Sequence, residues 1–416
     1  MSLPSESTAR TKITSLSKMS TAYVPPSEIN ALVESINKAA ANFETAAISQ
    51  GDVHLARKRL QYEAHKLLSS LEEPNDEVWS RTFQVNVSAS LEVVSQLKLW
   101  EKFEGGKSVA LSDIVASTEA DEIIIIRLFR QLTAAHLFAE DIGPNGPTFT
   151  LTALGRPYLH PDHRAFNNFM FFDLIPSIMA MPKTLAEKGY KAATKSTGTP
   201  FEWAHGEELW TWIGARPDRA ANMVAAMTSH NALNAYPWGA ELTKLGLEDQ
   251  DVAVVDVAGG QGHIMSEVRR NNPQIKGRFI VQDLPSTYEA FPTPPAGIEF
   301  MGYDIFTPQS VKGAYFYHYR HIFHNWSDDD CTTILEQIVP LLKTQPQSKL
   351  LLVDVVLPDT DATMQDAIMD ISMYPMGGLE RTESQWKLLL ARSGLEITKI
   401  WRGSEPEACI ECKITE

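Results

Sequence analysis

Short apolar runs alternate with helix-like segments from Asp251 to the C-terminus. The runs are AVVDVA, RFIVQDL, IEFMGYD, AYFYHYRHIF and KLLLVDVVLP, and the chain ends with LEITKIWRG and ACIECKIT. Between them, residues 328–343 and 383–394 place apolar side chains three and four positions apart, which is helical spacing. Strands that are apolar on both faces need helices on both sides of a mostly parallel sheet. The pattern therefore predicts an α/β fold with a Rossmann-like, doubly wound domain over residues 246–416.

The segments before this domain have other patterns. Residues 1–24 are rich in Ser and Thr and are predicted to form a disordered tail. Residues 25–155 are predicted to be helical and to end in the helix, helix, hairpin order of a winged helix, with Asp121 as a helix cap. Residues 156–245 are helical and rich in aromatic residues and Met. Such a composition is typical of an ordinary core and also of a pocket for a flat apolar substrate, and both interpretations stay open.

The charge of the chain argues against a nucleic-acid partner. A winged helix often binds DNA, but the second helix here carries only Arg127 and Arg130 beside four isoleucines. The formal net charge is −15, which disfavours binding to nucleic acid or to anionic lipid. The sequence therefore favours a dimerisation module over a DNA-binding one.

Composition also bears on the compartment. No run approaches the roughly 18 apolar residues of a membrane span, and the N-terminus lacks the apolar core of a signal peptide. With three cysteines, the chain is predicted to lie in the reducing cytoplasm. Cys409 and Cys412 form a C-x-x-C, which is interpreted as two strand residues rather than a redox or zinc motif, and no metal site is predicted.

The first strand ends in a glycine-rich turn within VVDVAGGQGH, residues 254–263. Ligands of such sheets bind beyond the carboxyl ends of the strands, where glycines admit a close approach. Asp256 precedes the first small residue, Ala258, by two positions, which suits a nucleoside with a cationic amino-acid tail better than a pyrophosphate. Asp283 ends the second strand and is predicted to bind ribose hydroxyls, and Asp304 ends the third and could face the adenine edge.

A series of motifs follows in a fixed order: VVDVAGGQGH, VQDLP, YDIF, YRHIFHNWSDDDC, VDVVLPD and GGLERT. On these motifs, residues 50–416 resemble the plant and fungal caffeate-type (class II) O-methyltransferases, which use S-adenosylmethionine. The resemblance implies an N-terminal helical and winged-helix dimerisation domain, a helical substrate cap over residues 156–245, and a C-terminal methyltransferase domain. It implies a homodimeric enzyme that methylates a hydroxyl of an aromatic or polyketide-derived secondary metabolite.

The resemblance also implies roles for individual residues. His324 is the predicted general base, and Asp354 and Glu380 are predicted to orient its imidazole. A phenol has a pKa near 10, so a neutral imidazole oriented by a carboxylate can take its proton as the methyl group is attacked. His318 and His321 are interpreted as structural. The predicted cofactor-binding residues are Asp256, Gly259, Gly260, Gly262, Asp283, Leu284, Asp304, Ile305 and Arg320.

Two positions depart from the family pattern, which usually has glycine at 258 and aspartate at 325. Ala258 is expected to adopt a positive φ at a cost of about 1 kcal/mol and to leave cofactor binding intact. Asn325 removes a negative charge beside the base, so it is expected to lower the pKa of His324.

These departures keep two other functions open. Fungal relatives of the family include pericyclases, which retain the fold and often the cofactor but catalyse dehydration or cycloaddition without methyl transfer. In that case His324 and Arg320, with His160 or His163, would supply hydrogen bonds and a positive field. A catalytically silent scaffold is the third interpretation, and the retained His324, Asp354 and Glu380 argue against it.

Overall fold

The computed structural model describes residues 24–49, 53–193, 197–228, 235–290, 293–345, 347–360, 362–403 and 407–415. All of the predicted disordered tail except residue 24 lies outside these ranges. The chain divides into two compact units, residues 1–88 and 89–416, each of which is described by itself. The predicted boundaries at residues 155 and 245 fall inside the second unit and stay predictions.

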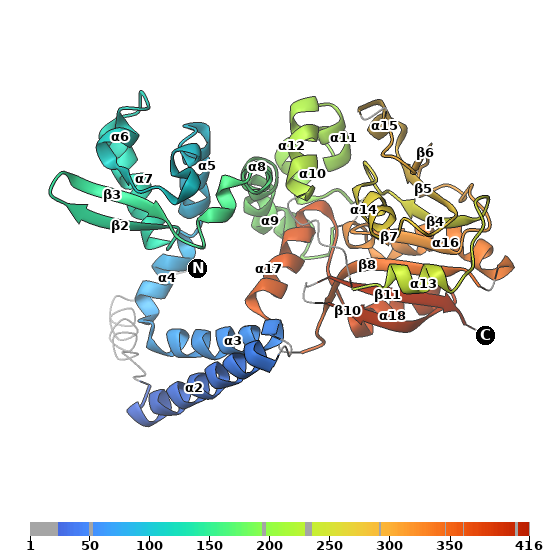
Figure 1. The fold of residues 1–416 in the computed structure, drawn as a ribbon, viewed down its shortest axis with the longest axis horizontal. Helices are drawn as coiled ribbons and strands as arrows, with labels where there is room; N and C mark the ends of the chain where they lie inside the picture. The colour runs from blue at the N-terminus through green and yellow to red at the C-terminus, as the bar shows by residue number, and fades with distance from the viewer. Residues whose placement is uncertain are drawn as a thin grey trace, which may run out of the picture. The chain divides into compact units, whose positions relative to one another are not determined.

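The first unit is helical, as predicted. Its helices are α2 (Pro26–Ser49), α3 (Val53–Leu71), α4 (Pro74–Thr82) and the start of α5 (Val85–Gln96). Helices α2 and α3 lie side by side (Figure 1). Pro74 opens α4, where a missing N–H costs nothing, and Asp76 and Glu77 in its first turn face the positive end of the helix dipole.

The second unit begins with the predicted order of helix, helix and hairpin. Helices α6 (Leu111–Val115) and α7 (Glu122–Ala134) precede strands β2 (Phe138–Gly143) and β3 (Gly146–Leu151). A short strand β1 (Val109–Ala110) completes an antiparallel sheet in the order β1-β3-β2. Asp121 occupies the N-cap position of α7, as predicted, but its exposed side chain makes no capping hydrogen bond in the described part of the chain.

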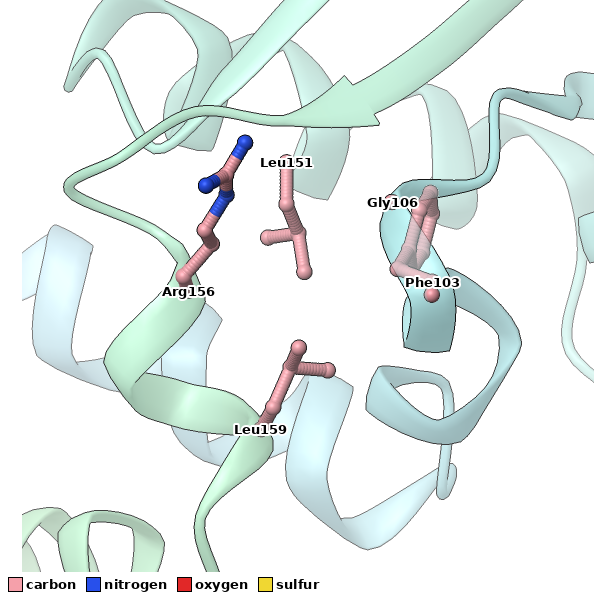
Figure 2. A pocket seen from close by; sticks show the side chains of 6 residues that line it. Phe103, Gly106, Leu151, Arg156 and Leu159 are labelled. Atoms are coloured by element: carbon pink, nitrogen blue, oxygen red, sulfur yellow. The ribbon is translucent and has the colours of Figure 1, made fainter.

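A cavity of about 310 Å³ lies in this part of the unit, between the 3₁₀ helices η1 (Trp100–Gly106) and η2 (Arg156–Leu159) (Figure 2). Its lining residues are Phe103, Gly105, Gly106, Leu151, Arg156 and Leu159. Apart from Arg156, the lining side chains are apolar, and none of the residues predicted to bind cofactor or substrate belongs to it. The cavity is therefore not the predicted cofactor or substrate site.

Helices α8 to α12, here called the cap helices, follow. They are α8 (Pro161–Phe169), α9 (Ile175–Glu187), α10 (Pro200–His205), α11 (Leu209–Gly214) and α12 (Pro217–Thr228), with a π-helical turn η3 (Met170–Leu174) between α8 and α9. The side chain of Asp173 in η3 is enclosed, forms an ion pair with Arg219, and accepts a hydrogen bond from Trp212 Nε1 at 3.2 Å. This buried pair joins α12 to the α8–α9 segment.

One helical stretch differs from what the sequence was expected to contain. Residues Pro161–Glu187 form a run that is long and apolar enough to cross a membrane by length and composition alone. The expectation of no such run is therefore wrong on those two criteria. Some of its apolar side chains, among them Phe169 and Leu174, are buried in the second unit, whereas Phe172 and Met179 are exposed.

The main sheet has the strand order β10-β11-β8-β7-β4-β5-β6. Its strands are β4 (Val252–Val257), β5 (Arg278–Asp283), β6 (Glu299–Gly302), β7 (Phe316–Arg320), β8 (Lys349–Leu357), β10 (Leu395–Arg402) and β11 (Glu407–Ile414), and β9 (Arg381–Thr382) pairs with β8. Strands β4 to β8 are parallel, whereas β10 and β11 run antiparallel. The predicted mostly parallel sheet is confirmed. The order reverses at β4, whose neighbours are β5 and β7, and that reversal marks the ligand position in such folds.

Helices cover both faces of this sheet, as a doubly wound fold requires (Figure 1). Helices α16 (Asp328–Thr344) and α18 (Glu383–Arg392) bury one face, and α13 (Trp238–Thr243) and α14 (His263–Asn271) bury the other. Shorter segments α15 (Pro285–Ala290), η4 (Phe323–Asn325), α17 (Met364–Met373) and η5 (Tyr374–Met376) connect the strands. Cys412 packs in the first core and Cys409 in the second, so the two thiols lie on opposite faces of β11. The C-x-x-C is thus two buried strand residues, as interpreted, and no metal-ligand cluster occurs in the described ranges.

Candidate functional site

The three predicted catalytic side chains meet beyond the carboxyl end of β7. The turn η4 carries His324, β8 carries Asp354, and Glu380 immediately precedes β9. His324 Nδ1 lies 2.9 Å from Glu380 Oε1 and 3.8 Å from Asp354 Oδ1. The imidazole is 12% exposed and both carboxylates are enclosed. Segments far apart in the chain therefore converge on one imidazole that keeps a small opening to solvent.

Close packing lets Glu380 reach the imidazole. A Cβ atom added to Gly378 would lie 2.0 Å from the carbonyl oxygen of His324, so only glycine fits there. Leu379 N–H donates a hydrogen bond of 2.9 Å to the same oxygen. The GGLERT motif thus lies directly against the turn that carries the histidine.

Buried carboxylates dominate the electrostatics of this cluster. Burial opposes protonation of His324, but Asp354 and Glu380 outweigh it and raise the pKa of His324 above its usual value. Burial also raises the pKa of Asp354 to about 7, and neither of its carboxylate oxygens has a hydrogen-bond partner in the described part of the chain. His324 in this cluster therefore binds a proton more strongly than a free histidine does.

The expectation that Asn325, in place of an aspartate, lowers the pKa of His324 stays a prediction, because the raised pKa of His324 is relative to a free histidine and not to an enzyme with aspartate at 325. Asn325 Nδ2 donates a hydrogen bond of 2.8 Å to the carbonyl oxygen of His321. An aspartate could not donate this bond. Asn325 therefore stabilises the backbone of the turn, while Asp354 and Glu380 set the direction of the shift.

A second histidine, His321, belongs to the same cluster. Its ring is stacked on that of His324 with centroids 5.3 Å apart, and its backbone has a positive φ of 53°. Its Nε2 lies 2.8 Å from Glu407 Oε2, which also accepts a hydrogen bond of 3.0 Å from Arg320. The structural interpretation of His321 is incomplete, because its side chain is 36% exposed beside the predicted base. Glu407, on β11, was not predicted as a site residue, because nothing in the sequence relates it to Arg320, which lies 87 positions earlier.

The glycine-rich turn after β4 has the predicted backbone. Ala258 adopts φ +56°, and Gly260 and Gly262 adopt φ +58° and +72°. A Cβ atom on Gly259 would lie 2.3 Å from Asp256 Oδ2, so the absence of a side chain there is required by close approach. The expectation of a left-handed alanine is confirmed.

Asp256 lies beneath this turn. It is 2% exposed, and its Oδ1 lies 2.7 Å from Nδ1 of His318, which is fully buried on β7. The structural interpretation of His318 is therefore confirmed. Asp256 supports the turn from the interior, and a direct contact of its carboxylate with the cofactor stays a prediction.

Asp283 lies beside the turn. Gly260 N–H donates to Asp283 Oδ2 at 2.8 Å, and Leu284 N–H and Thr287 Oγ1 donate to its Oδ1 at 2.8 Å each. Burial raises the pKa of Asp283 against these hydrogen bonds. Asp304 follows β6 and is exposed, with Oδ1 accepting a bond from Phe306 N–H at 3.0 Å.

These residues fit a nucleoside cofactor. No heavy atom lies within 4 Å of a Cβ position at Gly260, so the turn is open on that side. The exposed side chain of Leu284 and the Asp283 carboxylate border the same turn. An adenosine group requires a carboxylate that binds its ribose hydroxyls and an apolar side chain that contacts its adenine ring.

Residues 186–396 match the family model of the O-methyltransferase domain. Over 311 residues, the chain is 33% identical to demethylsterigmatocystin 6-O-methyltransferase of Aspergillus flavus, which covers 73% of this chain and 78% of that protein. The chain belongs to the O-methyltransferase family. This O-methyltransferase is also 29% identical over 399 residues to O-methyltransferase afvC of Aspergillus flavus, covering 90% of this chain and 93% of the relative.

Solved structures agree with this assignment. The O-methyltransferase is similar to a structure described as a pericyclic reaction enzyme, with a TM-score of 0.80, 25% identity, and coverage of 92% of this chain and 100% of that one. It is equally similar to LepI in complex with S-adenosylmethionine, with a TM-score of 0.80, 26% identity and coverage of 92% and 100%. The predicted family, enzyme class and cofactor, S-adenosylmethionine, are thereby confirmed.

Proposed function

We propose that the enzyme transfers a methyl group to a hydroxyl of an aromatic or polyketide-derived metabolite, with His324 as general base. The observation that carries this proposal is the 2.9 Å contact between His324 Nδ1 and Glu380 Oε1. With Nδ1 engaged, Nε2 is the nitrogen left for substrate, and it has no partner within the described ranges. Similarity to methyltransferases of fungal metabolites supports this substrate class.

The residues of the chain would act as follows. Glu380 accepts the Nδ1 proton of His324, which fixes the tautomer with a lone pair on Nε2. That lone pair takes the hydroxyl proton of the substrate, and Glu380 and Asp354 then stabilise the imidazolium. When bound, S-adenosylmethionine supplies an electrophilic methyl group. Asp354, at 3.8 Å, acts through charge rather than through a hydrogen bond.

The cofactor would bind at the glycine-rich turn. In this proposal Asp283 binds the ribose hydroxyls, and Leu284, Asp304 and Ile305 contact the adenine. Gly260 and Gly262 admit the ligand, while Asp256 and Gly259 shape the turn from beneath. Arg320 lines the site, and its guanidinium is fixed by Glu407 at 3.0 Å.

Release of S-adenosylhomocysteine tests the proposal. Incubation with phenolic and polyketide-derived acceptors should release one equivalent for each substrate converted. His324→Ala should lower kcat by roughly 10² or more. Full conversion of a substrate without release of S-adenosylhomocysteine would refute the methyltransferase function, and unchanged kcat in His324→Ala would refute the base. Substrate-dependent release also rules out the silent scaffold.

The second candidate is a pericyclase that retains the cofactor without methyl transfer. Similarity to the pericyclic reaction enzyme over 92% of this chain favours it. Mass spectrometry of the product separates the two candidates. A product heavier than its substrate by one methyl group excludes the pericyclase, whereas an isomer or a dehydrated product excludes the methyltransferase.

We further propose that the enzyme is a homodimer. The first unit exposes apolar side chains along its helices: Val33, Ile48, Val53, Tyr62, Leu68, Leu71, Val78, Trp79, Phe83 and Val85. In the second unit, α17 exposes Met364, Ile368 and Ile371 at helical spacing. Large exposed apolar patches mark association surfaces. Sedimentation velocity should give the mass of two chains, and Trp79→Asp combined with Phe83→Asp should shift it toward one.

The acidic net charge supports an enzyme that binds neither nucleic acid nor membranes. Free Cys331, Cys409 and Cys412 support a cytoplasmic location.

The sedimentation experiment also gives the result that would contradict the dimer, which is a wild-type mass of one chain at micromolar concentration.

A further inference from the structure

Arg381 lies under the turn that carries His324. Its side chain is fully buried, although arginine is rarely enclosed without several partners. Nη1 donates a hydrogen bond of 2.9 Å to the carbonyl oxygen of Phe323, and Nη2 donates one of 2.9 Å to that of Trp326. These two carbonyls come immediately before and two residues after the base. One planar guanidinium therefore fixes both ends of the segment that presents the imidazole.

The guanidinium is itself held in one orientation. Its Nε donates to Asp328 Oδ1 at 2.9 Å, at the start of α16, and its plane lies over the ring of Trp386 at 5.3 Å. Nη2 also contacts Cys331 Sγ at 3.5 Å. A lysine has a single ammonium group and cannot satisfy acceptors in this fork arrangement. The geometry is specific for arginine.

Adjacent residues thus hold the base in two ways. Glu380 contacts the imidazole through Oε1, and the next residue, Arg381, binds the backbone of the same turn. Any shift of the strand β9 would move both contacts together. The orientation of the ring and the position of its backbone are therefore coupled through one dipeptide.

Charge balance adds a second role. The enclosed carboxylates Asp354 and Glu380 lie beside His324, and the positive charge of Arg381 acts on both His324 and Asp354. Arg381 therefore offsets part of the negative charge of this cluster when Asp354 is ionised. Burial lowers the pKa of His324, the two carboxylates raise it by more than burial lowers it, and the charge of Arg381 opposes that rise. Burial raises the pKa of Asp354 to about 7, against the attraction of His324 and Arg381.

Other charged groups face this cluster from the neighbouring elements. His321 stacks on His324 from the end of β7, and Glu407 on β11 contacts His321. On the far side of the guanidinium, Asp328 on α16 also contacts Arg392 on α18 at 3.5 Å. His321 and Glu407 form their own pair, whereas the charge of Arg381 acts on Asp354.

We propose that Arg381 is a positioning residue that fixes the turn of His324 and, by offsetting one of two buried carboxylates, keeps the base free to accept a proton between turnovers. The inference rests on the proposed function of His324 as the base. It assigns Arg381 no contact with substrate or cofactor.

The test compares Arg381→Lys with Arg381→Gln. The imidazole of His324 is titrated by NMR with labelled histidine, and its signal is assigned by its loss in His324→Gln. Arg381→Gln should raise the pKa of His324 above the wild-type value, because the cluster loses its positive charge. Arg381→Lys should leave that pKa near wild type but lower kcat by roughly 10², because the turn loses its fixed position. An unchanged pKa in Arg381→Gln, or wild-type kcat in Arg381→Lys, would overturn the inference.

A milder pair of variants guards against loss of the fold. Asp328→Asn keeps the shape of the side chain that binds Arg381 Nε but removes its charge, and it should lower kcat several-fold. Asp329→Asn is the matched control, since Asp329 is the next residue and its side chain is 99% exposed. Equal kcat in the two variants would count against the role of Arg381. Calorimetric binding of S-adenosylhomocysteine at wild-type affinity shows that each variant is folded.

The NMR comparison needs no turnover. If the wild-type enzyme releases no S-adenosylhomocysteine, the proposed function fails, while the titration still decides whether Arg381 controls the protonation of His324.

Discussion

The left-handed alanine in the cofactor turn allows a direct measurement of stored backbone strain. Ala258 adopts φ +56°, a region that costs a residue with a Cβ about 1–2 kcal/mol. Ala258→Gly removes this cost. Glycine also adds conformational freedom to the unfolded chain, which lowers the gain by about 0.4–1 kcal/mol. The free energy of unfolding should therefore rise by about 0.8 kcal/mol in the variant, the difference between the midpoints of these two ranges.

Thermal unfolding with a matched control provides the assay. A gain of that size corresponds to an increase in Tm of about 1 °C for a chain of 416 residues. The control is Ala221→Gly, at an exposed position inside α12 where φ is not positive, and it should lower the free energy of unfolding by up to about 1 kcal/mol. Two variants with the same chemical change should thus shift Tm in opposite directions.

The affinity for S-adenosylhomocysteine gives the second readout. If the ligand-bound turn keeps the same φ, the strain is present in both states and Kd should change by less than about threefold, or 0.6 kcal/mol. A Tm that falls in Ala258→Gly as it does in Ala221→Gly would refute the strain argument. A tenfold gain in affinity would show instead that the methyl group of Ala258 crowds the ligand.

Three further predictions concern the site. As the general base, His324 must be neutral to act, and Asp354 and Glu380 raise its pKa despite burial. The value of kcat/KM should therefore fall with decreasing pH, with a midpoint above 6.5, the usual pKa of histidine. A pH–rate profile with a midpoint below 6.5 would contradict this prediction. Gly259→Ala should weaken S-adenosylhomocysteine binding at least tenfold by calorimetry, since its Cβ would lie 2.3 Å from Asp256 Oδ2; wild-type Kd would disprove the close approach. Gly378→Ala should lower kcat more than it raises the KM for the cofactor, because its Cβ would lie only 2.0 Å from the His324 carbonyl oxygen and would displace that oxygen. An unchanged kcat in steady-state kinetics would count against this prediction.

Much of the fold follows from local patterns. The alternation of apolar strands and helices after Asp251 predicted the parallel sheet, because strands that are apolar on both faces have few other arrangements. The positive φ of Ala258 was predictable from the small residues around it. Helix existence was also predictable, whereas the absence of a capping bond at Asp121 depends on a side-chain rotamer that a sequence pattern does not determine.

The site was predictable only where motifs encode it. Motifs placed His324, Asp354 and Glu380 together, and the structure agrees. The pairing of Glu407 with His321 depends on the antiparallel return of β11 beside β8, a long-range register with no local signal. The hydrogen bond from Asn325 to the carbonyl of His321 was not predictable, because a sequence pattern does not show which backbone oxygen lies within reach of the side-chain amide.

The side-chain pair between Asp256 and His318 has a consequence for how such an enzyme acquires new substrates. Asp256 and His318 are partners in the register of β4 and β7, the two adjacent strands that lead into the cofactor turn and the histidine turn. In the proposed function, the sheet would therefore set the distance between the methyl donor, bound at the glycine-rich turn, and the proton acceptor His324. If the predicted substrate cap determines which substrate binds, changes in the cap helices would alter substrate range without changing that distance. Exchanging residues 156–245 with those of a relative should therefore redirect specificity while preserving the reaction chemistry.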